Sequence, residues 1–154
     1  MTQNTSLGVP QTTEEMKMSI ESNKDVIRQA YGAVSRGDAD GFLACACDDI
    51  TFTLYGKHRF ARTFTGKQDL VDNLLVPMGE TLGGLMQIEI TNLIGEGDYV
   101  VMEALGWSDI KAGGTYNNTY CLVFEMRDGK IKAVREYLDT ERVTEVFGAI
   151  DERA

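Results

Sequence analysis

The sequence predicts an α+β fold in which helices fill the first half of the chain and an antiparallel sheet fills the second. Apolar residues recur at helical spacing between residues 26 and 47, and again between residues 70 and 75. From residue 86 to residue 138 they alternate with polar residues, which is the period of a strand. Two runs of β-branched and aromatic residues flank Asp128-Gly129, a pair that tolerates the positive φ angles of a tight hairpin turn. Helices at one end and consecutive strands at the other are typical of α+β proteins.

Composition narrows the classes of protein to consider. The chain has 154 residues, which fit a single domain with a substantial core, and its formal net charge of −9 argues against nucleic acid as a partner. No apolar run approaches the roughly 20 residues of a membrane helix, and residues 1–15 lack the pattern of a secretory signal. The three cysteines, Cys45, Cys47 and Cys121, form no CxxC pair and predict reduced thiols. We therefore expect a cytoplasmic protein with no membrane partner.

The helical half opens with a polar stretch. Residues 1–21 predict a flexible N-terminal arm, and residues 22–150 predict a single domain. Ser22 or Asn23 can cap the first helix, and Gly37 ends it. The apolar residues of this helix share one face, which holds Val26, Ile27, Ala30, Tyr31 and Val34.

A second, shorter helix leads into the first strand. Asp38 can cap this helix, and Asp48-Asp49 ends it. Residues 50–55 then alternate as a strand, with one apolar face made of Ile50, Phe52 and Leu54. Residues 56–62 are basic and irregular and hold the only histidine, His58. We expect His58 in a solvated loop, with a place at a pocket mouth as the alternative.

A third helix follows the basic loop. Thr65 and Gln68 have the spacing of a capping box, which marks a helix start. Its buried side would hold Leu70, Val71, Leu74 and Leu75. Pro77 and Gly79 are expected to weaken or bend the helix, and Gly83-Gly84 marks a turn.

The second half predicts four consecutive strands joined by turns that contain glycine. The first strand starts at Met86, and the next three span residues 99–110, 116–126 and 131–138. Asp139 or Thr140 can cap a final helix, whose inward residues are Val143, Val146 and Phe147. A strongly curved sheet that wraps around the first helix would leave a conical cavity.

Two segments of the chain resemble the nuclear transport factor 2-like superfamily. The first runs from Ile27 through Gly37-Asp38 to Phe52, and the second from Tyr116 through Asp128-Gly129 to Asp139. The resemblance covers about residues 23–147. It implies a cone-shaped, cystatin-like α+β fold, in which a curved antiparallel sheet wraps around N-terminal helices. The superfamily includes ketosteroid isomerases, SnoaL-type polyketide cyclases, limonene epoxide hydrolases and proteins that are not enzymes.

The catalytic positions of these relatives can be compared with this chain. Where ketosteroid isomerases have a catalytic aspartate, a tyrosine and a protonated aspartate, this chain has Leu54, Ala30 and, nearby, Leu122. Where the epoxide hydrolases have arginine, aspartate, tyrosine and asparagine, it has Glu103, Leu105, Phe52 and Leu54. The resemblance to SnoaL-type cyclases implies one acidic residue on a late strand, and Glu136 stands there.

Strand alternation then predicts the pocket. If Glu136 faces the cavity, its wall consists of Phe52, Leu54, Leu105, Trp107, Asn118, Tyr120, Leu122, Val134 and Leu138. Burial among apolar side chains would raise the pKa of Glu136 and suit it to general acid/base catalysis. Glu103 would face Glu136 and share a proton with it. The alternatives are a salt bridge from Glu136 to Arg135 or Lys132, and a solvated position for Glu103.

The predicted function is cofactor-free acid/base chemistry of the isomerase, cyclase or hydrolase type. Its substrate would be a small hydrophobic molecule that bears oxygen atoms, oriented by Asn118 and Tyr120. The alternative is a non-catalytic small-molecule-binding or protein-interaction module, because neither the isomerase set nor the epoxide hydrolase set is intact. One histidine and no cysteine pair at ligand spacing predict no metal. A homodimer is expected through an outer sheet face that carries Val100, Met102, Ala104 and Val123.

Overall fold

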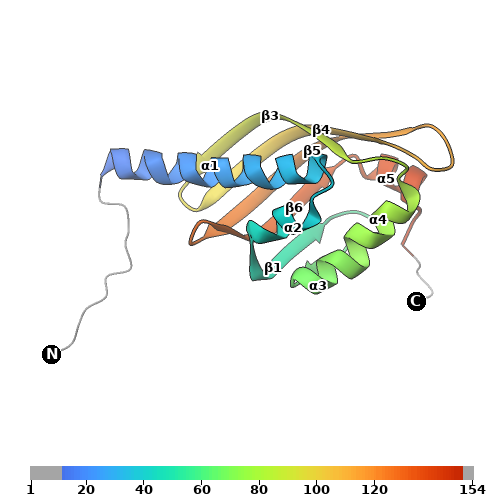
Figure 1. Cartoon of the computed structure of the whole chain (residues 1–154), viewed down its shortest axis with the longest axis horizontal. Helices are drawn as coiled ribbons and strands as arrows, with labels where there is room; N and C mark the ends of the chain where they lie inside the picture. Colours follow the sequence, from blue (N-terminus) through green and yellow to red (C-terminus); the bar gives the residue numbers. More distant parts are fainter. Residues whose placement is uncertain (1–11, 151–154) are drawn as a thin grey trace.

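A long helix lies along the concave side of a curved, six-stranded sheet in the computed structural model, which describes residues 12–150 (Figure 1). The strand order is β2-β1-β6-β5-β4-β3; β1 and β6 are parallel, and the other pairs are antiparallel. The predicted α+β fold is confirmed. The elements in chain order are α1 (Thr13–Ser35), α2 (Ala39–Ala44), β1 (Ala46–Leu54), β2 (Thr63–Thr65), α3 (Lys67–Leu70), η1 (Val71–Leu75), α4 (Val76–Thr81), β3 (Gln87–Glu96), β4 (Tyr99–Asp109), β5 (Thr115–Arg127), β6 (Lys130–Leu138) and α5 (Thr140–Phe147).

Helix α1 begins earlier than predicted. Thr12 and Glu15 form a capping box, in which the Thr12 hydroxyl accepts from the Glu15 N–H at 3.0 Å and the Glu15 carboxylate accepts from the Thr12 N–H at 3.1 Å. The predicted cap at Ser22 or Asn23 is therefore wrong, and residues 13–21 of the expected arm are helical. Residues 1–11 of that arm lie outside the described residues.

The first strand also starts before its predicted position. Asp38 caps α2 as expected, since its carboxylate accepts from the Gly41 N–H at 2.8 Å. Asp48-Asp49, predicted to end that helix, lies within β1 instead. The parallel pairing of β1 with β6 extends the strand back to Ala46, which lies opposite Ile131. A long-range contact thus overrides the local helical pattern.

The third helical segment starts without the predicted capping box. Thr65 belongs to strand β2, opposite Thr51, and Gly66 at φ 84° is the N-cap residue of α3. The Thr65 N–H donates instead to the Asp69 carboxylate at 2.8 Å. The π-helical turn η1 precedes Pro77, which has no N–H to donate to the preceding turn. The expected distortion of this helix therefore takes the form of a wider turn.

The meander of β3 to β6 and its hairpin agree with the sequence prediction. Asp128 and Gly129 have φ angles of 53° and 74°, as a tight turn of this kind requires. The core lies between α1 and the concave face, where the Tyr31 ring contacts the rings of Phe42 and Phe124 edge-on, each at 5.7 Å between centroids. No helix among residues 12–150 combines the length and the apolar character needed to cross a membrane.

The inner face of β4 differs from the prediction. Val100, Met102 and Ala104, expected on the outer face, are buried on the concave side. Pairing decides this orientation, because Met102 lies opposite Leu122 and Ala104 opposite Tyr120 on β5. Directly paired residues project from the same face of a sheet.

His58 is fully buried, so the prediction that it lies in a solvated loop is wrong. Its Nδ1 accepts from the Phe60 N–H at 3.2 Å, and its Nε2 therefore carries the proton and donates to the Tyr55 carbonyl at 3.0 Å. Burial lowers the pKa of His58, which favours this neutral form. The histidine packs against the C-terminal segment through its bridge to Ala149 and does not line the cavity described below.

The orientation of β4 can be tested by truncating one buried side chain of β4 and one exposed side chain of the neighbouring strand β3. Met102→Ala should lower the free energy of unfolding by about 2–5 kcal/mol, because it empties a fully buried position. Ile94→Ala, at a half-exposed position on the adjacent β3, should cost less than about 1 kcal/mol. Urea denaturation measures both changes. Equal losses in the two variants would contradict this orientation.

Candidate functional site

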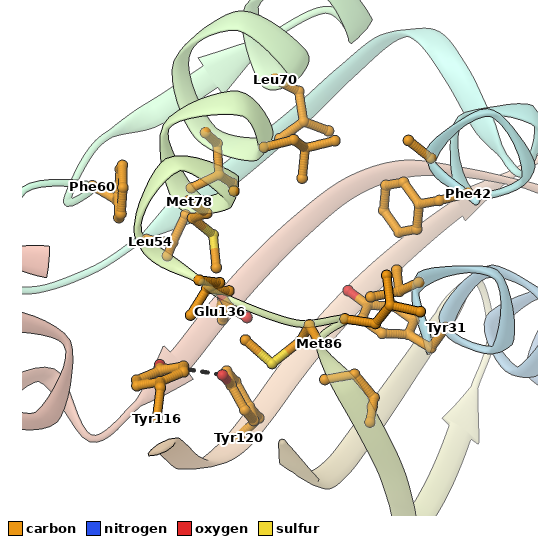
Figure 2. Close-up of a pocket in the computed structure, with 18 of the residues that line it drawn as sticks. Tyr31, Phe42, Leu54, Phe60, Leu70, Met78, Met86, Tyr116, Tyr120 and Glu136 are labelled. Atoms are coloured by element: carbon orange, nitrogen blue, oxygen red, sulfur yellow. Dashed lines mark hydrogen bonds between the residues drawn. The ribbon is translucent and has the colours of Figure 1, made fainter. Parts of the chain in front are cut away.

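An open cavity of about 400 Å³ lies between the concave face of the sheet and the surrounding helices (Figure 2). Strands β1, β5 and β6 form its floor, and the segment from α3 to α4 covers one side. The wall is mostly apolar. Its side chains with a polar group are Tyr31, Tyr116, Tyr120 and Glu136.

Alternation along the strands sets which side chains reach the cavity. Residues two apart on β6 face the same way, so Glu136 and Leu138 point inward together. On β5, Tyr116 and Tyr120 project from the same face. Figure 2 shows Glu136 in the middle of the cavity, with the tyrosine pair on one side and the apolar residues Leu54 and Met78 on the other.

Glu136 carries the only carboxyl among the described side chains that line the cavity. Burial alone raises its pKa from 4.5 to about 8. Neither predicted salt-bridge partner reaches it: Lys132 pairs with Glu125 at 3.1 Å, and the guanidinium of Arg135 lies 6.0 Å from the ring centre of Tyr99. Among residues 12–150, none donates a hydrogen bond to this carboxyl, so it is available to a ligand.

A hydrogen-bonded cluster supports the tyrosines. The Oδ1 of Asn118 accepts from the N–H groups of Thr119 at 2.8 Å and Asp139 at 3.0 Å. Its Nδ2 donates to the Asp139 carbonyl at 3.0 Å and to the Tyr116 hydroxyl at 2.9 Å. The Tyr120 hydroxyl donates to the same Tyr116 oxygen at 3.2 Å. The cluster therefore joins the cavity wall to the backbone where β6 meets α5.

The structure brings part of the predicted pocket together. Phe52, Leu54, Tyr120, Glu136 and Leu138 line the cavity. The other inward residues, Asn118, Leu122 and Val134, are buried on the same face behind this wall.

Three predicted residues lie on the opposite face of the sheet. Leu105 and Trp107 are 43% and 42% exposed, and the carboxylate of Glu103 accepts from the Asn92 amide at 3.2 Å. These residues cannot reach the cavity, so the predicted carboxylate pair with Glu136 is wrong. The sequence shows the alternation of β4, but only its pairing with β5 decides which set faces inward.

Sequence reasoning missed two hydroxyl groups. Tyr31 was assigned to the buried face of the first helix, yet it also borders the cavity. Tyr116 stands two residues before Asn118 and shares its face, so the same alternation could have found it. Within residues 12–150, no three His, Cys, Asp or Glu side chains gather as metal ligands.

The raised pKa of Glu136 predicts a specific pH dependence of stability. Between about pH 4.5 and pH 8 the folded protein keeps a proton that the unfolded chain releases. The retained proton adds to the free energy of unfolding. This favourable effect is fully present below about pH 4.5 and is lost as the pH rises through about 8. Glu136→Gln has a neutral side chain at every pH. As the pH rises from about 4.5 to about 8, its free energy of unfolding, measured by urea denaturation, should therefore increase relative to that of wild type.

A matched variant controls for the loss of one negative charge. Glu103→Gln removes an exposed carboxyl from the other face of the sheet. The same dependence on pH in both variants would contradict a buried, protonated Glu136.

Comparisons with known proteins agree with this geometry. The chain matches the SnoaL-like domain family over residues 27–134. An uncharacterized protein of Mycobacterium tuberculosis is 24% identical over 135 residues, which cover 86% of this chain and 100% of that protein. An NTF2-like protein from Burkholderia xenovorans superposes with a TM-score of 0.67 at 22% identity, covering 84% of this chain and 98% of its own.

A further solved structure with a similar fold comes from a co-crystallization experiment. TerC, co-crystallized with polyporic acid, superposes with a TM-score of 0.68 at 24% identity, covering 83% of this chain and 99% of its own. The structural likenesses show a nuclear transport factor 2-like fold, as the resemblance implied. Because the family match spans most of the described residues, this chain belongs to the SnoaL-like domain family.

Proposed function

We propose that this protein is a cofactor-free enzyme that moves protons within a small hydrophobic molecule bearing oxygen atoms. One observation carries the proposal: the carboxyl of Glu136 lies in a mostly apolar cavity and accepts no hydrogen bond from the described residues, and burial raises its pKa to about 8. The reaction would be of the isomerase, cyclase or hydrolase type, with Glu136 as the general acid/base.

A carboxyl with this pKa suits proton transfer near neutral pH. The best catalytic acid or base titrates close to the working pH, because both of its forms are then populated. An ordinary glutamate is almost entirely ionised there and is a weak base. Burial of Glu136 changes this balance without a neighbouring charge.

The cavity supports a small organic substrate. Its volume of about 400 Å³ falls within the usual range for ligand pockets, which is roughly 300–1,000 Å³. The wall offers apolar contacts with hydroxyl groups on one side, as a hydrophobic molecule with oxygen atoms requires. TerC, a protein of similar structure, was co-crystallized with the organic molecule polyporic acid, which supports an organic ligand for this fold. A module that only contacts other proteins would not need an open cavity with a titrating group.

Glu136→Gln tests the proposed role in catalysis. The amide keeps the shape of the side chain but cannot exchange a proton, so turnover should fall by about 100-fold or more with little change in substrate affinity. Wild type and the variant would be incubated with a panel of small ketones, enols and epoxides, followed by mass spectrometry. The proposal predicts compounds that only the wild type consumes, while Glu103→Gln behaves as wild type. Equal consumption by wild type and the Glu136→Gln variant would exclude Glu136 from the mechanism.

We also propose that the convex face of the sheet carries a second copy of the chain. Large apolar side chains are exposed there, among them Leu105, Trp107 and Tyr137 at 42–46%, and Tyr137 stacks on Tyr55 at 4.9 Å between ring centroids. Glu103 and Arg135 project from the same face, so a twofold arrangement could set opposite charges against each other. Of the residues first expected at this interface, only Val123 projects from this face.

Sedimentation tests the dimer. Wild type should sediment at about 34 kDa, twice the 17.0 kDa of one chain, at micromolar concentration. Leu105→Asp should shift the protein to the monomer, because it places a charge in the apolar face. Val76→Asp, at an exposed position on α4, should not. A wild-type protein that sediments only as a monomer would overturn this proposal.

A further inference from the structure

We propose that Tyr116 donates the hydrogen bond that holds an oxygen atom of the ligand beside Glu136, and that Asn118 sets the direction of that bond. This inference rests on the proposed function, because it names the group that positions the substrate of the same cavity. The supporting hydrogen bonds connect the backbone near Asn118 to the Asn118 amide and the amide to the Tyr116 hydroxyl. They leave the proton of that hydroxyl available.

The orientation of the Asn118 amide is determined by the backbone around it. Its Oδ1 accepts two N–H groups, from Thr119 at 2.8 Å and from Asp139 at 3.0 Å. A flipped amide would set its own N–H groups against these two donors. Its Nδ2 must therefore face the Tyr116 hydroxyl at 2.9 Å, and it can only donate.

The Tyr116 hydroxyl consequently acts as an acceptor toward the protein. It receives one hydrogen bond from Asn118 and a second from the Tyr120 hydroxyl at 3.2 Å. Both lone-pair directions of the Tyr116 oxygen are then used. Its own proton has no acceptor in Asn118 or Tyr120, so it remains for a group in the cavity.

The same bonds make the two tyrosines unequal. Tyr120 uses its proton on Tyr116 and can offer a ligand only an acceptor. Burial raises the pKa of Tyr116, while the hydrogen bonds from Tyr120 and Asn118 act in the opposite direction. Donors to a hydroxyl oxygen polarise its O–H bond, so Tyr116 becomes the stronger donor of the pair.

The location of Tyr116 fits this role. Both tyrosines line the cavity beside Glu136, as Figure 2 shows. Burial raises the pKa of both hydroxyls, and Glu136 raises it further when it is ionised. A ligand that exchanges a proton with Glu136 would thus meet the Tyr116 donor at the same end of the cavity. We infer a preference for ligands with a carbonyl or similar acceptor oxygen next to the proton that moves.

A carbonyl probe can report this bond directly. Prodan is a neutral naphthalene ketone whose emission moves to longer wavelength when its carbonyl accepts a hydrogen bond. Titrated into wild type, prodan should bind with hydrogen-bonded emission and a lowered carbonyl stretching frequency in the infrared. Tyr116→Phe should move both signals toward those of an unbonded carbonyl and weaken binding by about 3- to 10-fold.

Matched variants remove the other hydroxyl groups of the cavity. Tyr120→Phe and Tyr31→Phe each delete one buried hydroxyl but leave Tyr116 bonded to Asn118, so the carbonyl signals should stay near wild type. Asn118→Ala should weaken the carbonyl bond by releasing the orientation of Tyr116. Thermal unfolding of each variant shows whether it is folded.

Two results would overturn the inference: no binding of prodan to wild type, or the same carbonyl signals in wild type and Tyr116→Phe. A loss of the signals in Tyr31→Phe but not in Tyr116→Phe would assign the donor to α1 instead. The readout is independent of Glu136 chemistry. If Glu136→Gln proved fully active, the proposed function would fail while the carbonyl shift remained.

Discussion

The register between β4, β5 and β6 is the constraint on which the cavity depends. Pairing sets Met102 opposite Leu122 and Leu122 opposite Glu136, so these three side chains all project from the concave face. The tight turn at Asp128-Gly129 starts the pairing of β5 with β6 by setting Arg127 opposite Lys130. A slip of one residue would carry Glu136 to the convex face, where its pKa would return toward that of an ordinary glutamate.

Burial of the Glu136 carboxyl works against the stability of the fold. An ionised carboxylate without a partner is expensive in apolar surroundings, and the group responds by holding its proton to higher pH. Fully buried residues of the core, such as Ile27, Met102 and Phe124, supply the compensating hydrophobic stabilisation. A destabilising ionisable group retained in an open cavity is the pattern expected where function and stability compete.

The polar side of the cavity depends on the junction between β6 and α5. Asp139 caps α5, since its carboxylate accepts from the N–H groups of Glu141 and Arg142 at 3.1 and 3.2 Å. The backbone of the same residue holds the Asn118 amide on both sides. The helix start, the asparagine and the Tyr116 hydroxyl thus form one connected arrangement, which keeps a polar group ordered inside an otherwise apolar wall.

The sequence by itself determined the α+β class, the meander with its Asp128-Gly129 turn and the cap at Asp38, because these follow from local periodicity and turn chemistry. The inward position of Glu136 was expected from the family resemblance, and the pairing of β6 with β5 decides it. Local signals were misleading where a distant partner competes. The parallel pairing with β6 drew Asp48-Asp49 into β1, and contacts with the C-terminal segment buried His58. Alternation in β4 divides its side chains into two sets but does not tell which set faces the core. Only the pairing with β5 places Glu103, Leu105 and Trp107 on the outer face. The tertiary structure alone decided these features, because each depends on contacts between residues far apart in the chain.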